Sequence, residues 1–244
     1  MSISYMNTPG VKIKEVATLP PSVVQVSTAI PVFLGYTVQG PLNQGKRITS
    51  LKEYEDEFGG AFQYEPEVTA GEALPDSVGK FFLYEAIRAY FLNGGGPCYI
   101  VSVGTAAADK DIEIGDFNNG LAEVAKHDEP TLVVCPEAIG LSTANYGTLA
   151  GKMLTLCADM QDRFALLDSP SDLEDLTKDS DLTAYRTALG TNDLSYGAAY
   201  YPPLSTVMTY SFGSGTQYTT GTPAQAKTLA ALATEGGAAY QEAL

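Results

Sequence analysis

Residues 5–41, YMNTPGVKIKEVATLPPSVVQVSTAIPVFLGYTVQGP, decide how the rest of the chain is organised. The second part of this stretch, residues 28–38, is β-branched, aromatic and apolar, with turn-forming residues on both sides. A short apolar run of this composition is typical of a buried β-strand. We therefore expect residues 28–38 to form a strand inside a sheet.

The first part of this stretch, residues 5–25, predicts an extended arm. Proline fixes φ and lacks an amide donor, which excludes a helix or a central strand, and the arm contains Pro9, Pro20 and Pro21. Apolar and polar residues alternate along Val11–Lys14, and this period of two gives the arm one apolar face. No following segment is an obvious hairpin partner, so this face lacks a partner nearby in the sequence.

The composition describes a chain that can bury a large core, as one large or two small domains. It has 244 residues, 45% of them hydrophobic. The net charge is −15 and the sequence pI is about 4.3. Phosphate binding needs clustered Lys and Arg, so a surface this acidic should repel nucleic acid and anionic membranes. We therefore expect no nucleic-acid partner and no direct membrane insertion. We also expect no signal peptide, and no apolar run approaches membrane-spanning length.

The cysteines predict no metal site. The chain has three, Cys98, Cys135 and Cys157, an odd number without a C-x-x-C pair. Two lie in apolar, strand-like runs, so we expect buried, reduced thiols and a reducing compartment. With a single histidine, His127, a zinc site is not expected, and we expect no cofactor.

Strand and helix patterns alternate through the middle of the chain. After the first strand, the expected strands are residues 97–103, 131–135, 162–168 and 196–201. The first expected helix is capped by Ser50, with Glu53 completing a capping box. Three more have expected caps: residues 78–93 capped by Ser77, residues 117–126 capped by Asp116, and a helix from Ser142 or Thr143 to about Met160. The last two expected helices are residues 172–190 and 223–233. The alternation predicts an α/β layered domain with a largely parallel central sheet, followed by a β-rich, incomplete C-terminal segment.

Three features that resemble ligand-binding motifs have simpler explanations. Gly94, Gly95 and Gly96 stand between a helix and a strand, the reverse of a phosphate loop, so they predict a helix stop and a tight turn. Counted from Asp109, the acidic loop lacks the glycine and glutamate of an EF-hand. Glu137 follows a strand at the sheet edge where ligands bind, but no nearby group completes an acid–base pair.

An α/β hydrolase or transferase is the alternative class of function. It would need a nucleophile and a base, and His127 is followed by Asp128 but no G-x-S-x-G elbow is present. We interpret His127 as a surface residue at a helix end, where a protonated imidazole is favourable. The sequence therefore predicts a protein without enzymatic activity.

Several motifs, in order along the chain, carry a family resemblance. The first, which contains P-G-V-x-I-x-E, is matched by Tyr5, Thr8, Pro9, Gly10, Val11, Ile13 and Glu15. The next block is matched by Pro21, Ser22, Val26, Thr28, Ala29, Phe33, Gly35, Gly40 and Pro41. Residues 48–59, 91–103 and 200–204 match three further signatures. In these motifs the chain resembles the N-terminal portion of contractile tail sheath proteins, found in phage tails, tailocins and contractile injection systems.

The resemblance implies a structural function. Sheath subunits stack in rings around an inner tube, their arms add strands to neighbouring subunits, and contraction drives the tube through a target envelope. The implied partners are further copies of the chain and inner tube, baseplate and terminator proteins. Assembly in the bacterial cytoplasm is implied, into a phage tail or injection particle that is then released. The arm residues implied to bind neighbours are Tyr5, Pro9, Gly10, Val11, Ile13, Glu15, Val16, Pro21, Val24 and Val26.

The resemblance also implies a domain division. Residues 1–26 would be the arm, 27–203 the α/β sheath domain, and 204–244 the start of an insertion or second domain. Family members continue into a C-terminal domain that faces the inner tube and receives arms, so we expect a truncated chain. Another phage tail or virion protein with the same plan of arm and domain is the alternative within the structural class.

Overall fold

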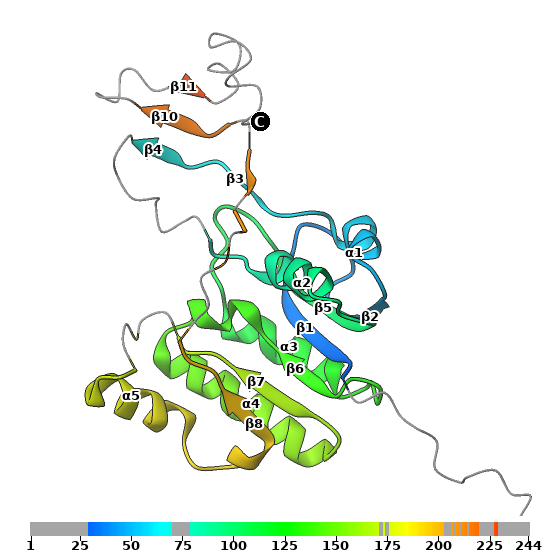
Figure 1. Cartoon of the computed structure of the whole chain (residues 1–244), viewed down its shortest axis with the longest axis vertical. Helices are drawn as coiled ribbons and strands as arrows, with labels where there is room; N and C mark the ends of the chain where they lie inside the picture. The colour runs from blue at the N-terminus through cyan, green and yellow to red at the C-terminus, as the bar shows by residue number, and fades with distance from the viewer. Residues whose placement is uncertain are drawn as a thin grey trace, which may run out of the picture.

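The computed structural model describes residues 29–69, 79–170, 173, 176–202, 206, 208–209, 211–213, 215–219 and 227–228. These residues form an α/β domain with a smaller group of short strands beyond one end of its sheet (Figure 1). The predicted arm, residues 1–26, lies outside the described residues.

The α/β domain is built on a six-stranded sheet of order β2-β5-β1-β6-β7-β8. In chain order the strands are β1 (Pro31–Thr37), β2 (Gly45–Ile48), β5 (Cys98–Thr105), β6 (Leu132–Val134), β7 (Phe164–Leu167) and β8 (Gly197–Ala199). Every pairing is parallel except that of β2 with β5. The prediction of a largely parallel central sheet is therefore confirmed.

Strand β1 lies inside this sheet, and all seven of its residues are buried. It pairs with β5 on one side and with β6 on the other. A parallel sheet with helices on both faces needs strands that are apolar on both faces, which explains the continuous apolar run of β1. The predicted strand at residues 28–38 is confirmed, with shorter bounds.

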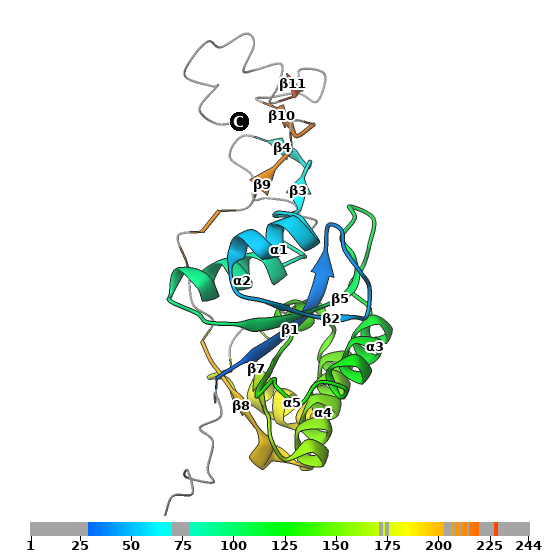
Figure 2. The ribbon, with the colours of Figure 1, turned by 90° about the vertical axis from the view of Figure 1, so that its right-hand side faces the viewer.

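Helices cover both faces of the sheet (Figure 2). On one face, α1 (Leu51–Phe58) and α2 (Leu83–Leu92) pack in a cluster that includes Phe33 and Ile100. On the other face, α3 (Ile114–Val124) and α4 (Thr143–Met160) pack against Val32 and Leu34 in the larger cluster. Successive residues of β1 point to opposite faces, so one strand supplies both cores. Helix α5 (Asp179–Leu189) packs against α4.

Two predicted helix caps are confirmed. The Ser50 hydroxyl accepts from the amide of Glu53 at 3.2 Å, while the Glu53 carboxylate accepts from the amide of Thr49 at 2.6 Å. The Ser142 hydroxyl accepts from the Asn145 amide and caps α4. These hydrogen bonds satisfy amides that have no partner within the helix.

Three predicted helix starts are wrong. Helix α2 begins at Leu83, five residues after the predicted start, and its predicted cap Ser77 lies outside the described residues. Helix α3 begins at Ile114 with Glu113 at its N-cap position, and the predicted cap Asp116 instead lies in the first turn, where it accepts from the Tyr36 hydroxyl at 2.8 Å. Helix α5 begins at Asp179, where Asp179 and Asp181 favour its N-terminus.

The smaller group of strands joins segments far apart in the sequence. Strand β3 (Gln63–Tyr64) pairs with β9 (Ser211–Phe212), and β4 (Glu67–Thr69) pairs with β10 (Gln217–Thr219). Strand β11 (Lys227–Thr228) pairs antiparallel with β10, so the predicted helix at residues 223–233 is wrong there. The pairing with β10 overrides the high helix propensity of this alanine-rich segment, because tertiary contacts routinely outweigh local propensity. We call β3, β4, β9, β10 and β11 the β unit.

The packing of α2 makes a graded prediction for stability. The Ile87 side chain is fully buried in the cluster of α1 and α2, whereas Phe91 is only half-buried. We expect Ile87→Ala to lower the free energy of unfolding by about 2–5 kcal/mol and Phe91→Ala to lower it by less. Urea unfolding of both variants measures this. Equal losses would show that α2 does not present Ile87 to the core as described.

Candidate functional site

The residues that the resemblance implies for binding neighbours all precede residue 29 and lie outside the described residues. What the structure places is the point where the chain enters the sheet. The Ile30 amide donates to the Thr131 hydroxyl at 3.1 Å, and the Thr131 amide donates to the Ile30 carbonyl at 2.8 Å. The segment before β1 is therefore tied to the start of β6, next to the middle of the sheet.

The carboxyl ends of the parallel strands are where an open α/β sheet binds ligands. The chain runs from β1 to β5 on one side of β1 and then crosses to β6 on the other side. This reversal of strand order places a crevice beside the end of β1 in folds of this class. Here the position is filled by Glu137, in the short helix η1 (Pro136–Gly140) that follows β6.

Glu137 serves as the cap of α2. Its side chain is 0% exposed, and its Oε1 atom accepts from the Leu83 amide at 2.9 Å. Phe82, at the N-cap position of α2, makes no side-chain capping bond, so the carboxyl from a distant element replaces one. Gly35 leaves room for it: a Cβ atom there would lie 2.1 Å from Glu137 Oε2. The helix N-terminus, a ready-made anion site, is thus occupied by the protein itself.

Burial dominates the electrostatics of Glu137. Loss of hydration raises the pKa of its carboxyl to about 8, and hydrogen bonds from backbone groups, foremost that of Leu83, act in the opposite direction. Its Oε2 atom has no hydrogen-bond partner among the described residues. The sequence placed Glu137 at the functional edge of the sheet but gave no sign that its partner is a helix 54 residues away.

A second buried ionisable side chain, that of Arg163, caps a helix C-terminus. Its guanidinium donates to the carbonyls of Val124 at 3.1 Å and His127 at 2.9 Å, at the C-terminus of α3. It is also paired with Asp162 at 2.7 Å. Carbonyls at a helix C-terminus lack partners within the helix and favour a cation. Sequence reasoning missed this residue, and its one signal was an arginine at the start of an apolar strand.

The residues weighed for catalysis do not form a catalytic group. His127 follows α3, as predicted for a helix end, and its Nε2 atom lies 3.3 Å from Glu123. All three cysteines are free and buried, which confirms the prediction of buried thiols. Burial raises the pKa of Cys98 and Cys157 to about 12, and that of Cys135 further, so they are protonated thiols near neutral pH.

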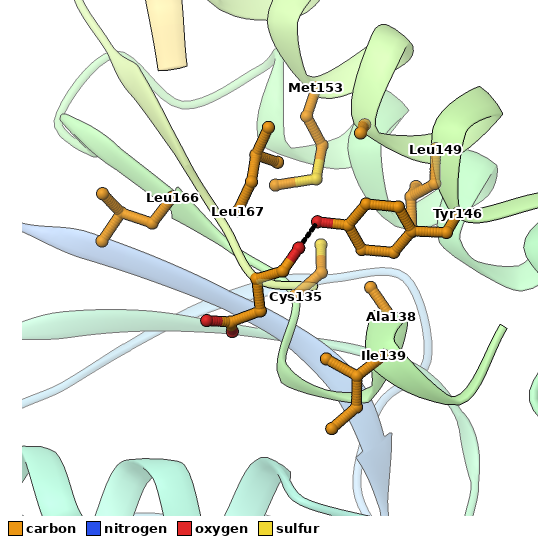
Figure 3. A pocket seen from close by; sticks show the side chains of 10 residues that line it. Cys135, Ala138, Ile139, Tyr146, Leu149, Met153, Leu166 and Leu167 are labelled. Atoms are coloured by element: carbon orange, nitrogen blue, oxygen red, sulfur yellow. Dashed lines mark hydrogen bonds between the residues drawn. The ribbon is translucent and has the colours of Figure 1, made fainter. Parts of the chain in front are cut away.

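A small cavity lies beside the carboxyl ends of β6 and β7 (Figure 3). Its volume is about 10 Å³, enough for one water molecule at most. The Tyr146 hydroxyl crosses it and donates to the Asp168 carbonyl, and the Tyr185 hydroxyl donates to the same carbonyl at 3.1 Å. The cavity is a packing defect lined by Tyr146 and is too small for a substrate.

A larger groove of about 390 Å³ opens near the start of α2. Phe82, Ile112 and Ile139 line it, and a 3.0 Å ion pair between Lys80 and Asp111 lies at its side. In the described part of the chain, no group of three metal-binding side chains occurs here or elsewhere. The groove therefore has apolar walls and one ion pair but no identified acid–base pair.

The two edges of the sheet differ in charge. At β2, Lys46 pairs with Glu57 and Arg47 pairs with Glu129, each at 3.2 Å. Strand β8 has no charged residue, and exposed apolar side chains flank it at Leu194, Tyr200 and Tyr201. Charged side chains protect a sheet edge from pairing with another chain, so β8 is the less protected edge. Among the described helices, none is long and apolar enough to cross a membrane.

The sequence matches no protein-family model and no curated protein. Solved structures do match. A chain in the cryo-EM structure of the anti-feeding prophage (AFP) baseplate in the contracted state matches with a TM-score of 0.55 and 24% identity, over 84% of this chain and 50% of that chain. The protein shares its fold with this AFP baseplate chain.

Two further AFP structures match more weakly. A chain of the AFP helical sheath in the contracted state has a TM-score of 0.46 and 25% identity, over 81% of this chain and 46% of that chain. A chain of the 6-fold symmetrised AFP baseplate has a TM-score of 0.44 and 25% identity, over 81% and 47%. The protein spans about half the length of each matched AFP chain. The fold shared with the AFP baseplate chain agrees with the resemblance expected from the sequence.

Proposed function

We propose that this protein is a structural subunit of a contractile injection particle. In this proposal it polymerises as a tail sheath around an inner tube and contracts to drive the tube through a target envelope. The fold shared with an AFP baseplate chain over 84% of the protein carries the proposal. The occupied crevice at Glu137 supports an assembly function, since the place where α/β enzymes bind ligands is filled by the protein itself.

The proposed assembly uses the arm. Residues 1–26 would add a strand to a neighbouring copy through main-chain hydrogen bonds, with the apolar face that includes Val11 and Ile13 against the acceptor. The arm would be followed by the α/β domain, residues 27–203, and by a second unit that begins near residue 204. Its further partners would be inner tube, baseplate and terminator proteins, met during assembly in a bacterial cytoplasm.

Arm variants test this proposal. Ile13→Pro removes an amide donor from the proposed added strand, and Val11→Asp places a carboxylate on its apolar face. When each variant is co-expressed with the inner tube protein, we expect an unchanged melting temperature but no sheath in negative-stain micrographs. Lys12→Gln, on the polar face, is the matched control and should assemble. Normal sheaths from both arm variants would contradict the arm's function, and a collapsed melting temperature would place the arm in its own domain's core.

A second candidate function is that of a baseplate component, because the AFP chain that matches with a TM-score of 0.55 comes from a baseplate structure. The same micrographs separate the two. A sheath protein forms long striated tubes whose length follows the inner tube, whereas a baseplate component forms discrete discs at one tube end.

A further inference from the structure

The start of α2 is hydrogen-bonded on two sides. On one side, the Leu83 amide donates to Glu137 of the α/β domain at 2.9 Å. On the other side, the Phe81 amide donates to the Tyr64 hydroxyl of β3 at 3.0 Å. The Tyr64 carbonyl in turn accepts from the Gly213 amide at 2.7 Å, next to β9. Residues 81–83 therefore connect Glu137 to the β unit.

Aromatic rings reinforce this connection. Phe81 packs against Tyr36 of the sheet with ring centroids 5.5 Å apart, and against Phe62 at 5.1 Å. Phe62 then packs against Tyr64 at 4.9 Å. A displacement of residues 81–83 would disturb this row of rings and its contact with β3.

Among the residues that the structure describes, no cation pairs with Glu137 to balance a negative charge. The titratable groups that its charge acts on are Tyr54 of α1 and Cys135 at the end of β6. Glu85 of α2 also acts on Tyr54, and one of its carboxyl oxygens is buried without a hydrogen-bond partner in the described structure. All of these groups are neutral or acidic. An ionised Glu137 has only backbone amides to stabilise it, whereas a neutral carboxyl needs no counter-ion.

We propose that Glu137 is a proton-operated latch, which holds the start of α2 and the attached β unit against the sheet while its carboxyl is neutral. Ionisation places a charge in a site that is closed to bulk solvent, since the Glu137 side chain is fully buried. Opening of residues 81–83 relieves this cost, because water then reaches the carboxylate. The latch is independent of the proposed function, since it rests only on contacts within the chain.

The direction of the pH effect follows from burial. The pKa of the Glu137 carboxyl is raised to about 8 in the closed state, from its ordinary value of 4.5 when hydrated. The closed state therefore binds the proton more tightly, and its advantage is complete below pH 4.5. The free-energy advantage of the closed state falls as the pH rises from 4.5 toward 8, and above pH 8 it stays at its lowest value. Between pH 7 and pH 9 the closed-to-open ratio should fall about tenfold.

Hydrogen exchange on the 244-residue protein tests the latch. Protection factors, corrected for the intrinsic pH dependence of exchange, are compared at pH 7 and pH 9. In the wild type we expect about a tenfold fall in α2 and in β3, but none in α4. Glu137→Gln keeps the size of the side chain and an oxygen for the Leu83 amide, and it should abolish the fall. Glu129→Gln is the control: hydrogen bonds from Tyr99 and Arg47 lower the pKa of this surface carboxyl, so the fall should persist.

Two results would overturn the latch. One is an equal fall in Glu137→Gln, which would assign the titration to another group. The other is a fall of the same size in α4 as in α2, which would mean that ionisation destabilises the whole domain. Should Glu137→Gln fail to fold, the comparison of α2 with α4 in the wild type still decides between a local and a global opening.

Discussion

Gly35→Ala is expected to destabilise the α/β domain by about 3 kcal/mol. The new Cβ atom would lie 2.1 Å from Glu137 Oε2 and 2.8 Å from its Cδ atom. The carboxyl cannot swing away into solvent, because it is fully buried and bonded to the Leu83 amide. Strand β1 cannot shift either, since it is paired on both sides. Urea unfolding curves give the loss directly.

A double-mutant cycle attributes this loss to Glu137. Glu137→Ala alone should cost about 1–3 kcal/mol, because the Leu83 amide loses its partner. In the double variant with Gly35→Ala, the obstructing carboxyl is absent, so the two losses should fall short of additivity by about 1–3 kcal/mol. Gly151→Ala is the matched control: it lies in α4 with open space at its Cβ position, and should be neutral or slightly stabilising. Strict additivity would refute the contact between Gly35 and Glu137.

Arg163→Ala is expected to cost about 3–5 kcal/mol. The guanidinium is fully buried and satisfies the carbonyls of Val124 and His127. Alanine leaves both carbonyls without a donor and removes the cation from the C-terminus of α3. Thermal and urea unfolding of the variant measure the effect.

Arg186→Ala provides the comparison for this prediction. Arg186 is exposed near the end of α5, so its removal should change stability by no more than about 0.5 kcal/mol. If Arg163→Ala is as mild as Arg186→Ala, the buried cap of α3 contributes nothing measurable.

The sequence predicts the parts of this fold that depend on neighbouring residues. The strand at β1 follows from a continuous apolar run, and the starts of α1 and α4 follow from Ser50 and Ser142, whose hydroxyls bond amides three residues on. The parallel sheet follows from the alternation of strands and helices. All of these signals lie within about a dozen residues.

Features that depend on distant residues could not be predicted in this way. The carboxyl of Glu137 caps the start of α2. Asp116 does not cap α3, and its carboxyl accepts a hydrogen bond from Tyr36, which is 80 residues away in the sequence. Likewise, the strands of the β unit are only two or three residues long, and the pairs β3–β9 and β4–β10 each join segments about 150 residues apart. A local pattern cannot show which remote group will satisfy an amide, a hydroxyl or a strand edge.

The inner position of β1 has a mechanical consequence. Tension applied to the segment before Ile30 would run along β1 and would load its hydrogen bonds to β5 and β6 in shear. Bonds on both sides must then rupture together, whereas an edge strand such as β8 can be peeled away one bond at a time. A domain anchored in this way can be pulled by its N-terminal segment and rotated as a rigid body without unravelling.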